Sequence, residues 1–166
     1  MKILVFTEGT VIMHKSALGL SRKRIVKQVI ENRDPSLRDW ASYVPVGKAV
    51  SKLNSWKNQQ AQILYLTSRI KDSEIAIIGN VLRKHDFPDG TLLHRTGNNQ
   101  YKDVAEKAMP DLIIEDDCES IGGLSEMTYT SLRTEVKEKI KHIVVKEFEG
   151  IDNLPDEITD LTKERG

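Results

Sequence analysis

The sequence has few of the features that mark a secreted, membrane-bound or nucleic-acid-binding protein. Its single cysteine, Cys118, cannot form a disulfide within the chain, which fits a reducing compartment. Lysine plus arginine and aspartate plus glutamate both number 25, so the formal net charge is zero and no bulk charge attracts nucleic acid or an anionic membrane. Aromatic residues make up only 5% of the chain, which leaves few rings for stacking on bases. We therefore expect no nucleic-acid partner.

Long apolar runs are also missing. No stretch approaches the roughly 20 residues of a membrane-spanning helix. The apolar stretch at residues 3–6 is too short for the core of a signal peptide. We therefore expect a cytoplasmic protein with no membrane association. With 166 residues the chain has the size of one domain, so residues 1–166 are predicted to fold around a single core.

The apolar residues alternate between short continuous runs and stretches with helical spacing. Such runs are typical of strands buried on both faces, and they predict strands at residues 2–6, 63–66, 91–94, 111–114 and 143–145. Helical spacing and capping residues predict helices at residues 46–57, from 72 or 73 to the turn at 87–90, 101–109 and 130–141. Strands separated by helices favour a parallel sheet, so the expected class is α/β.

Residues 12–45 form an insertion between the first predicted strand and the first long helix. The insertion contains a basic stretch at residues 22–27 with helical spacing. We interpret it as the solvated face of a helix whose Ile25, Val26, Val29 and Ile30 pack inward. Binding of nucleic acid through this stretch is disfavoured because the chain as a whole is neutral.

Polar residues gather where the predicted strands end. Thr7-Glu8-Gly9-Thr10 follows the first strand, Thr67-Ser68-Arg69 follows the second, and Glu115-Asp116-Asp117 follows strand 111–114. Lys102 begins the helix that leads to this last strand. In an open parallel sheet, ligands bind in the crevice at the carboxyl ends of the strands. We therefore expect these segments to meet in one cleft.

The order and spacing of these segments resemble the four active-site motifs of the haloacid dehalogenase (HAD) superfamily. Phosphatases of that family use Asp-x-Asp-Gly-Thr, a Thr or Ser, a Lys and an acidic pair. The stretches at residues 46–50 and 82–88 also resemble helices of the family. The resemblance implies a three-layer, Rossmann-like parallel sheet with a small insertion after the first strand. It also implies that residues 12–45 form a small cap over the site.

One residue departs from the motif. The family's nucleophilic aspartate stands at the position of Phe6, and its acid/base residue at the position of Glu8. Strand side chains alternate, so residues 6 and 8 share a face while Thr7 points away. Using Thr7 as a nucleophile would need a one-residue slip that turns every side chain of the strand to the wrong face. The resemblance therefore implies a phosphatase-like site that lacks its usual nucleophile, in which Glu8 either transfers a proton or only caps the turn at Gly9.

The resemblance also assigns residues that contact phosphate. It places the hydroxyl and N–H groups of Thr67 and Ser68, together with Lys102, around a phosphoryl oxygen, and Arg69 could add a bidentate contact. Alternatively, the Thr-Ser pair is a helix cap, and Lys107 takes the place of Lys102. The catalytic candidates are Glu8, Thr67 and Lys102, and the phosphate-binding candidates are Thr67, Ser68, Arg69 and Lys102.

The segment Glu115-Asp116-Asp117 is the strongest local signal. Adjacent carboxylates that follow a buried strand are costly unless a cation or hydrogen-bond donors compensate for their charge. Because Mg²⁺ prefers oxygen ligands, we predict a weak Mg²⁺ site. Asp116 is the first choice of ligand and Asp117 the second, and the resemblance adds Glu8. The alternative is an acidic loop that caps the turn before residues 122–123.

Two functions of different classes follow. The first is a degenerate phosphatase-fold protein that binds a divalent cation, a phosphorylated small molecule, or both, without forming an aspartyl-phosphate. The second is an active, Mg²⁺-dependent phosphohydrolase of nucleotidase-like type in which Glu8 or Asp116 activates a metal-bound water. The sequence does not define the ligand or the oligomeric state.

Overall fold

The structure is a computed structural model that describes residues 1–32 and 35–163. Its centre is a five-stranded sheet with the strand order β5-β4-β1-β6-β7. All pairings in this sheet are parallel. The strands are β1 (Lys2–Phe6), β4 (Gln62–Leu66), β5 (Thr91–Leu93), β6 (Leu112–Asp116) and β7 (Lys141–Val145). This topology confirms the predicted α/β class with a Rossmann-like parallel sheet.

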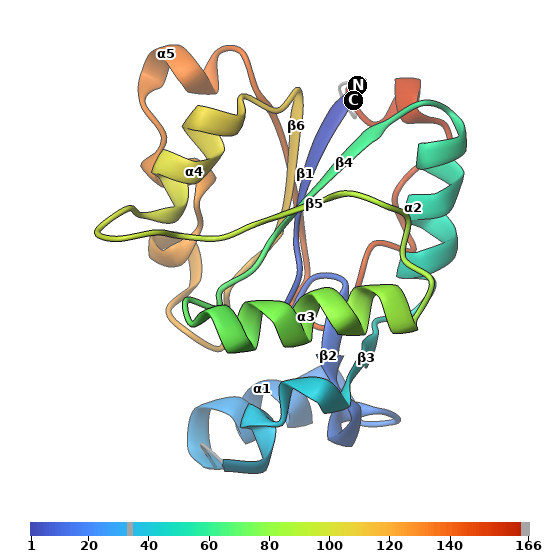
Figure 1. The fold of residues 1–166 in the computed structure, drawn as a ribbon, viewed down its shortest axis with the longest axis vertical. Helices are drawn as coiled ribbons and strands as arrows, with labels where there is room; N and C mark the ends of the chain where they lie inside the picture. The colour runs from blue at the N-terminus through green and yellow to red at the C-terminus, as the bar shows by residue number, and fades with distance from the viewer. Residues whose placement is uncertain (33–34, 164–166) are drawn as a thin grey trace.

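Helices cover both faces of the sheet and make a three-layer structure (Figure 1). Ile3 and Val5 of β1 face a core that also contains residues of α2 (Ala49–Asn58) and α3 (Asp72–Lys84). Leu4 faces the opposite core, which contains residues of α4 (Tyr101–Ala108) and α5 (Thr134–Lys137). This alternation is the two-residue period of a strand whose faces are both buried. Within the described residues, no helix is both long and apolar enough to cross a lipid bilayer.

The helices begin and end near the capping and charged residues that mark helix ends in the sequence. Helix α3 has Asp72 in its first turn and Arg83 in its last, charges that complement the helix dipole. Helix α4 begins after Gln100, whose backbone N–H donates to the Asp103 carboxylate at 2.7 Å. This cap places Tyr101 in the first turn of α4, at the end of the sheet where β1 finishes.

Most predicted boundaries differ from the structure by one to three residues, and two of the differences have a clear physical cause. The helix expected at residues 130–141 is shortened to α5 (Thr134–Lys137), and a separate 3-10 turn covers Tyr129–Ser131. Arg133 interrupts the helix because its backbone is extended, at φ −63° and ψ 147°, and its N–H donates to Glu106 at 2.9 Å. Strand β6 extends to Asp116, two residues beyond the predicted end, because Glu115 and Asp116 still pair with β7.

The insertion forms a small unit at the end of the sheet where β1 finishes (Figure 1). Strands β2 (Ile12–His14) and β3 (Tyr43–Pro45) pair in antiparallel fashion, and α1 (Arg22–Asn32) lies between them in sequence. The predicted segment 12–45 includes residues 33–34, which lie outside the described residues. Ile25 and Val26 are buried as expected. The prediction for Ile30 was wrong, because its side chain is 52% exposed on the outer face of α1.

Candidate functional site

A cavity of about 560 Å³ lies between the insertion and the carboxyl ends of the strands. Its sheet side includes Phe6, Glu8, Ser68, Arg69, Arg95, Tyr101 and Asp116. Its insertion side includes Met13, Ala17, Ile25, Val29, Leu37, Trp40 and Tyr43. The insertion therefore covers the cleft in which the polar ends of β1, β4 and β6 meet.

Phe6 is the last residue of β1 and lines the cavity. Its ring packs edge to face against the ring of Tyr101, with the centroids 5.9 Å apart. A phenyl ring has no lone pair for attack on phosphorus. The side chain at this strand end therefore supplies an apolar contact and no nucleophile. Thr7, the neighbouring hydroxyl, is fully buried and donates to Glu8 at 2.6 Å.

The Glu8 carboxylate is held by donors from two neighbouring strand ends. Its Oε1 accepts from the hydroxyl of Thr67 at 2.6 Å, and its Oε2 accepts from the N–H of Ser68 at 3.1 Å. Thr7 donates to the same Oε2. The register of β1 with β4, in which Phe6 lies opposite Leu66, places these residues side by side. The loop donors expected to hold a phosphoryl oxygen thus bind a carboxylate of this chain.

Arg69 and Lys102 are placed differently. Arg69 lines the cavity, with its Nε 3.7 Å from Oε1 of Glu8 and its guanidinium carbon 4.0 Å from the centre of the Trp40 ring. Lys102 lies on α4 and is not among the described residues that line the cavity, and its charge acts on Glu106 instead. Its role in binding phosphate stays a prediction.

Asp116 ends β6 and is buried beneath the loop that follows β1. Its Oδ2 accepts from the hydroxyl of Thr10 at 2.7 Å, and its Oδ1 accepts from the N–H of Cys118 at 3.0 Å. Gly9 is required in this loop, because a Cβ there would lie 2.9 Å from Oδ2 and its φ is +83°. Burial raises the pKa of Asp116 despite these donors.

Asp117 is bound by two cationic side chains. Nη2 of Arg22 lies 3.0 Å from both of its carboxylate oxygens, and Nζ of Lys146 lies 3.1 Å from one of them. The N–H of Glu147 also donates to Asp117, at 3.2 Å. Burial acts to raise the pKa of Asp117, but the Glu147 N–H, Lys146 and Arg22 outweigh it and lower the pKa. Arg22 begins α1, so this contact ties the insertion to the sheet.

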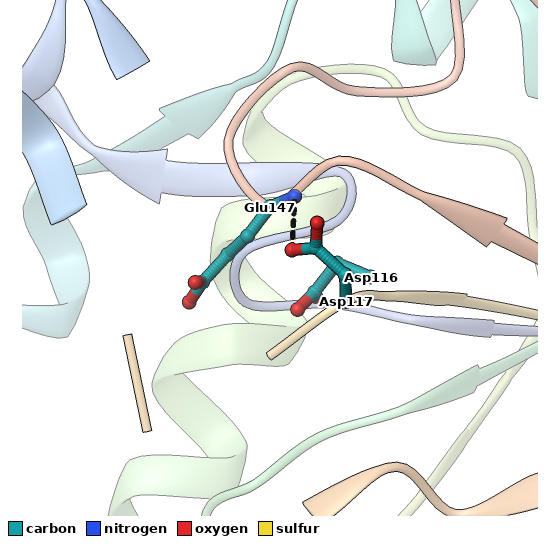
Figure 2. A group of neighbouring side chains, drawn as sticks. All are labelled: Asp116, Asp117 and Glu147. Atoms are coloured by element: carbon teal, nitrogen blue, oxygen red, sulfur yellow. Dashed lines mark hydrogen bonds between the residues drawn. The ribbon is translucent and has the colours of Figure 1, made fainter. Parts of the chain in front are cut away.

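Glu147 is a member of the site that the sequence analysis missed. It is the second residue after β7 and is buried, and its two carboxylate oxygens accept hydrogen bonds from Ser120, at 2.6 and 2.7 Å. Burial raises its pKa. The rule that polar residues after strands converge would have selected Glu147, because β7 pairs with β6. Figure 2 shows its carboxylate beside those of Asp116 and Asp117.

Oxygen atoms of Asp116, Asp117 and Glu147 lie within 4.8 Å of one another. Carboxylate oxygens suit Mg²⁺, and this set fits a cation on chemical grounds. Asp116, Asp117 and Glu147 face the two cations Arg22 and Lys146, but Arg22 also pairs with Glu119, so two negative charges remain when all four carboxylates are ionised. That balance fits the weak site expected from the sequence. Glu8, the third predicted ligand, is not part of this group.

Glu115 belongs to the other face of the sheet. Its carboxylate accepts from the N–H groups of Thr128 and Tyr129 at 2.8 and 2.9 Å, and Nε2 of His142 lies 2.9 Å from it. The ring of Tyr129 stacks on that of His142 with the centroids 4.1 Å apart. Of the three adjacent acidic residues, Glu115 therefore fixes the segment before α5, while the other two turn toward the insertion.

No family model and no curated protein matches this sequence. Solved structures do match its fold. Two structures of the class C acid phosphatase from Bacillus anthracis, one with tungstate bound, align over 90% of this chain and 68% and 67% of theirs, at 14% identity and TM-scores of 0.54 and 0.55. A chain of the Pnkp1/Rnl/Hen1 RNA repair complex aligns over 88% of this chain and 42% of its own, at 13% identity and a TM-score of 0.55. The chain therefore has the fold of HAD-like phosphatases.

Proposed function

We propose that this protein binds a small phosphorylated molecule in the cavity between the insertion and the sheet, and that it forms no phosphoenzyme. The observation that carries the proposal is the position of Phe6. Its ring lines the cavity at the end of β1, packed on Tyr101, where covalent catalysis would need a carboxylate. A binding function requires no nucleophile at that position.

The size and composition of the cavity support a small ligand. About 560 Å³ lies within the range of sites that enclose a small molecule. Aromatic and aliphatic side chains line most of it, and Arg69 and Arg95 supply positive charge on its wall. An apolar pocket with a few convergent polar groups is the usual form of a small-molecule site.

A divalent cation fits the same proposal. Mg²⁺ would be held by Asp116, Asp117 and Glu147, and when bound it supplies positive charge near the ligand. The charge of the bound ion would offset the burial of Asp116 and Glu147, whose raised pKa values mark the cost of ionising them in this site.

One observation favours a second candidate, a phosphohydrolase of nucleotidase-like type. Asp116 lines the cavity, and burial raises its pKa, which is a property of carboxyl groups that transfer protons. In this alternative Asp116 takes a proton from a water whose oxygen bonds to phosphorus, the ester P–O bond breaks, and the proton passes to the alcohol that leaves, while Arg69 binds the phosphate oxygens. The wall at Phe6 plays no chemical part in either case.

A binding and turnover screen tests the two functions together. Calorimetry with phenyl phosphate, ribose 5-phosphate, glucose 6-phosphate and AMP, with and without Mg²⁺, should show saturable binding of at least one of them. The matching alcohols or nucleoside serve as controls and should bind more weakly. We expect no phosphate release in the same samples. Release that requires Mg²⁺ and is abolished in Asp116→Ala would establish the phosphohydrolase, and an absence of all binding would reject both functions.

A further inference from the structure

Two arginines lie on the same wall of the cavity. Arg69 follows β4 and Arg95 follows β5, and these strands are neighbours in which Leu66 lies opposite Leu93. An aromatic ring orients each guanidinium. The carbon of the Arg69 guanidinium lies 4.0 Å from the centre of the Trp40 ring, and that of Arg95 lies 4.2 Å from the centre of the Tyr101 ring.

Arg95 has donors that the described residues do not satisfy. Its Nε is buried and has no hydrogen-bond partner among them. No carboxylate of the described residues lies within ion-pair distance of its guanidinium, whereas Arg69 has Glu8 at 3.7 Å. A buried donor without an acceptor costs free energy, and a charged one costs more. An anion in the cavity would compensate the charge of this guanidinium, which has no carboxylate partner among the described residues.

The anion-binding groups of the loop after β4 are already used. The hydroxyl of Thr67 and the N–H of Ser68 both donate to Glu8, so the loop after β4 carries a carboxylate from within the chain. A second anion placed in that loop would meet the charge of Glu8. The favourable position for a ligand anion is therefore beside Arg95, which lines the cavity and has no carboxylate partner among the described residues.

The insertion side of the cavity has a different character. Met13, Ala17, Ile25, Val29 and Leu37 line it there, and Met13, Ala17 and Ile25 belong to the small core of the insertion. These side chains offer apolar contact to whatever part of a ligand lies farther from the arginines. His14, Ser16, Gln28 and Arg38 also line the insertion side, so the apolar side chains form a patch on that wall, apart from Arg69 and Arg95.

We propose that Arg95, together with Arg69, binds the anionic group of an organic phosphate whose apolar portion lies against the insertion. The proposal rests on the proposed binding function and adds the position of the anion and the class of ligand. A guanidinium donates two parallel hydrogen bonds to phosphate oxygens, and its stacking on a ring holds the plane that this contact requires.

Calorimetry with phenyl phosphate, inorganic phosphate and phenol tests this arrangement. Phenyl phosphate should bind the parent protein at least about tenfold more tightly than inorganic phosphate or phenol does. Burial of the ring and contact with an arginine each contribute to its binding free energy. Arg95→Gln should weaken its binding by roughly 10- to 100-fold, the loss expected when a charged hydrogen-bonding partner is removed. Arg83→Gln, on the outer side of α3, is the matched control and should bind as the parent does.

A second measurement uses the parent protein and does not depend on the folding of a variant. The ¹⁵N resonance of the Arg95 side-chain Nε–H, identified by its loss in Arg95→Lys, should shift when phenyl phosphate is added. An unchanged dissociation constant in Arg95→Gln, or a resonance that does not move at saturation, would overturn the role of Arg95. Equal affinity for inorganic and phenyl phosphate would overturn the apolar contact. If the parent protein binds none of phenyl phosphate, ribose 5-phosphate, glucose 6-phosphate and AMP, the proposed binding function itself is wrong. Failure of the role of Arg95 and failure of the binding function therefore give different results.

Discussion

The ring of Phe6 meets the ring of Tyr101 edge to face, with the centroids 5.9 Å apart and the planes at 71°. An aromatic pair in this geometry adds about 0.5–1.5 kcal/mol beyond the burial of its surface. The end of β1 therefore helps to hold α4 against the sheet. In a catalytic site the same position would be occupied by a charged group that opposes such packing.

Phe6→Asp should place a carboxylate beside the cavity without restoring the whole site. We expect the parent to form no acid-labile, hydroxylamine-sensitive phosphoenzyme, and the variant to bind Mg²⁺ more tightly and to turn over acetyl phosphate slowly. Truncation of a buried Phe costs about 3–5 kcal/mol, and Phe6 is half-buried, so the fold must be checked by circular dichroism. Phe6→Asn is the uncharged control. Equal Mg²⁺ affinity in the Asp and Asn variants would contradict the prediction.

The paired substitution Asp116→Asn with Asp117→Asn should remove Mg²⁺ binding. Two of the three carboxylates that lie together lose their charge, so Arg22 and Lys146 balance Glu119 and Glu147 and no net negative charge remains to attract a cation. Calorimetric titration of the parent should show weak binding that the double variant lacks. Asp89→Asn, an exposed position, should behave as the parent. If the double variant binds Mg²⁺ as well as the parent does, the acidic segment is only a loop.

Arg22→Gln should have opposite effects on stability and on cation binding. Loss of the contacts to Asp117 should lower the free energy of unfolding by about 1–2 kcal/mol, at the low end for a charged hydrogen bond because the Arg22 side chain is 20% exposed. Removal of its positive charge should raise the Mg²⁺ affinity. Urea denaturation and calorimetry measure the two quantities. Arg24→Gln, an exposed position on the same helix, should change neither.

Glu147→Gln should change how stability depends on pH. The pKa of Glu147 in the folded chain lies above its ordinary value of 4.5 because the group is buried. The folded state therefore holds the proton more tightly than the unfolded state, and stability falls as the pH rises from 4.5 through the raised pKa. Asp116, whose pKa is also raised, acts in the same direction. Asp117 acts in the opposite direction because its pKa is lowered: its contribution to stability is lost only as the pH falls below 3.8 and through the lowered pKa.

The Gln side chain can keep both contacts to Ser120, because its oxygen accepts from the N–H and its amide donates to the hydroxyl. Thermal unfolding between pH 4 and pH 8 should therefore show a smaller decline in the variant than in the parent. The exposed control Glu149→Gln should follow the parent curve. Parallel curves for the parent and Glu147→Gln would show that ionisation of Glu147 carries no cost.

The sequence predicts the sheet well because local patterns determine it. The runs at residues 2–6 and 63–66 are continuous and apolar, and they become the adjacent strands β1 and β4. The convergence of Glu8 with Thr67 follows from the same rule about strand ends. Arg22 could not be predicted in this way. Its spacing fits a solvated helix face, and its partner Asp117 lies 95 residues away in the chain.

Arg95 and Lys102 also show that a sequence pattern does not determine which residues line the cavity. Lys102 has the position in sequence that a resemblance assigns to a phosphate contact, yet the described cavity wall contains Arg95 instead. Arg95 follows the short strand β5, and the ring on which it stacks, that of Tyr101, belongs to α4. A pattern of neighbouring residues contains no information about a pocket whose two walls come from distant parts of the chain.

The insertion enters from β1 and returns through β3 to α2, so both of its connections to the sheet lie close together. The insertion supplies one wall of the cavity from a single continuous stretch of chain, while β1, β4 and β6 lie outside it. Ile12, Trp40 and Tyr43 of the insertion also pack into the main core and so contribute to folding. Substitutions on the cavity side of the insertion that leave these three residues in place can change which molecule the cavity accepts while β1, β4 and β6 continue to pair as they do now.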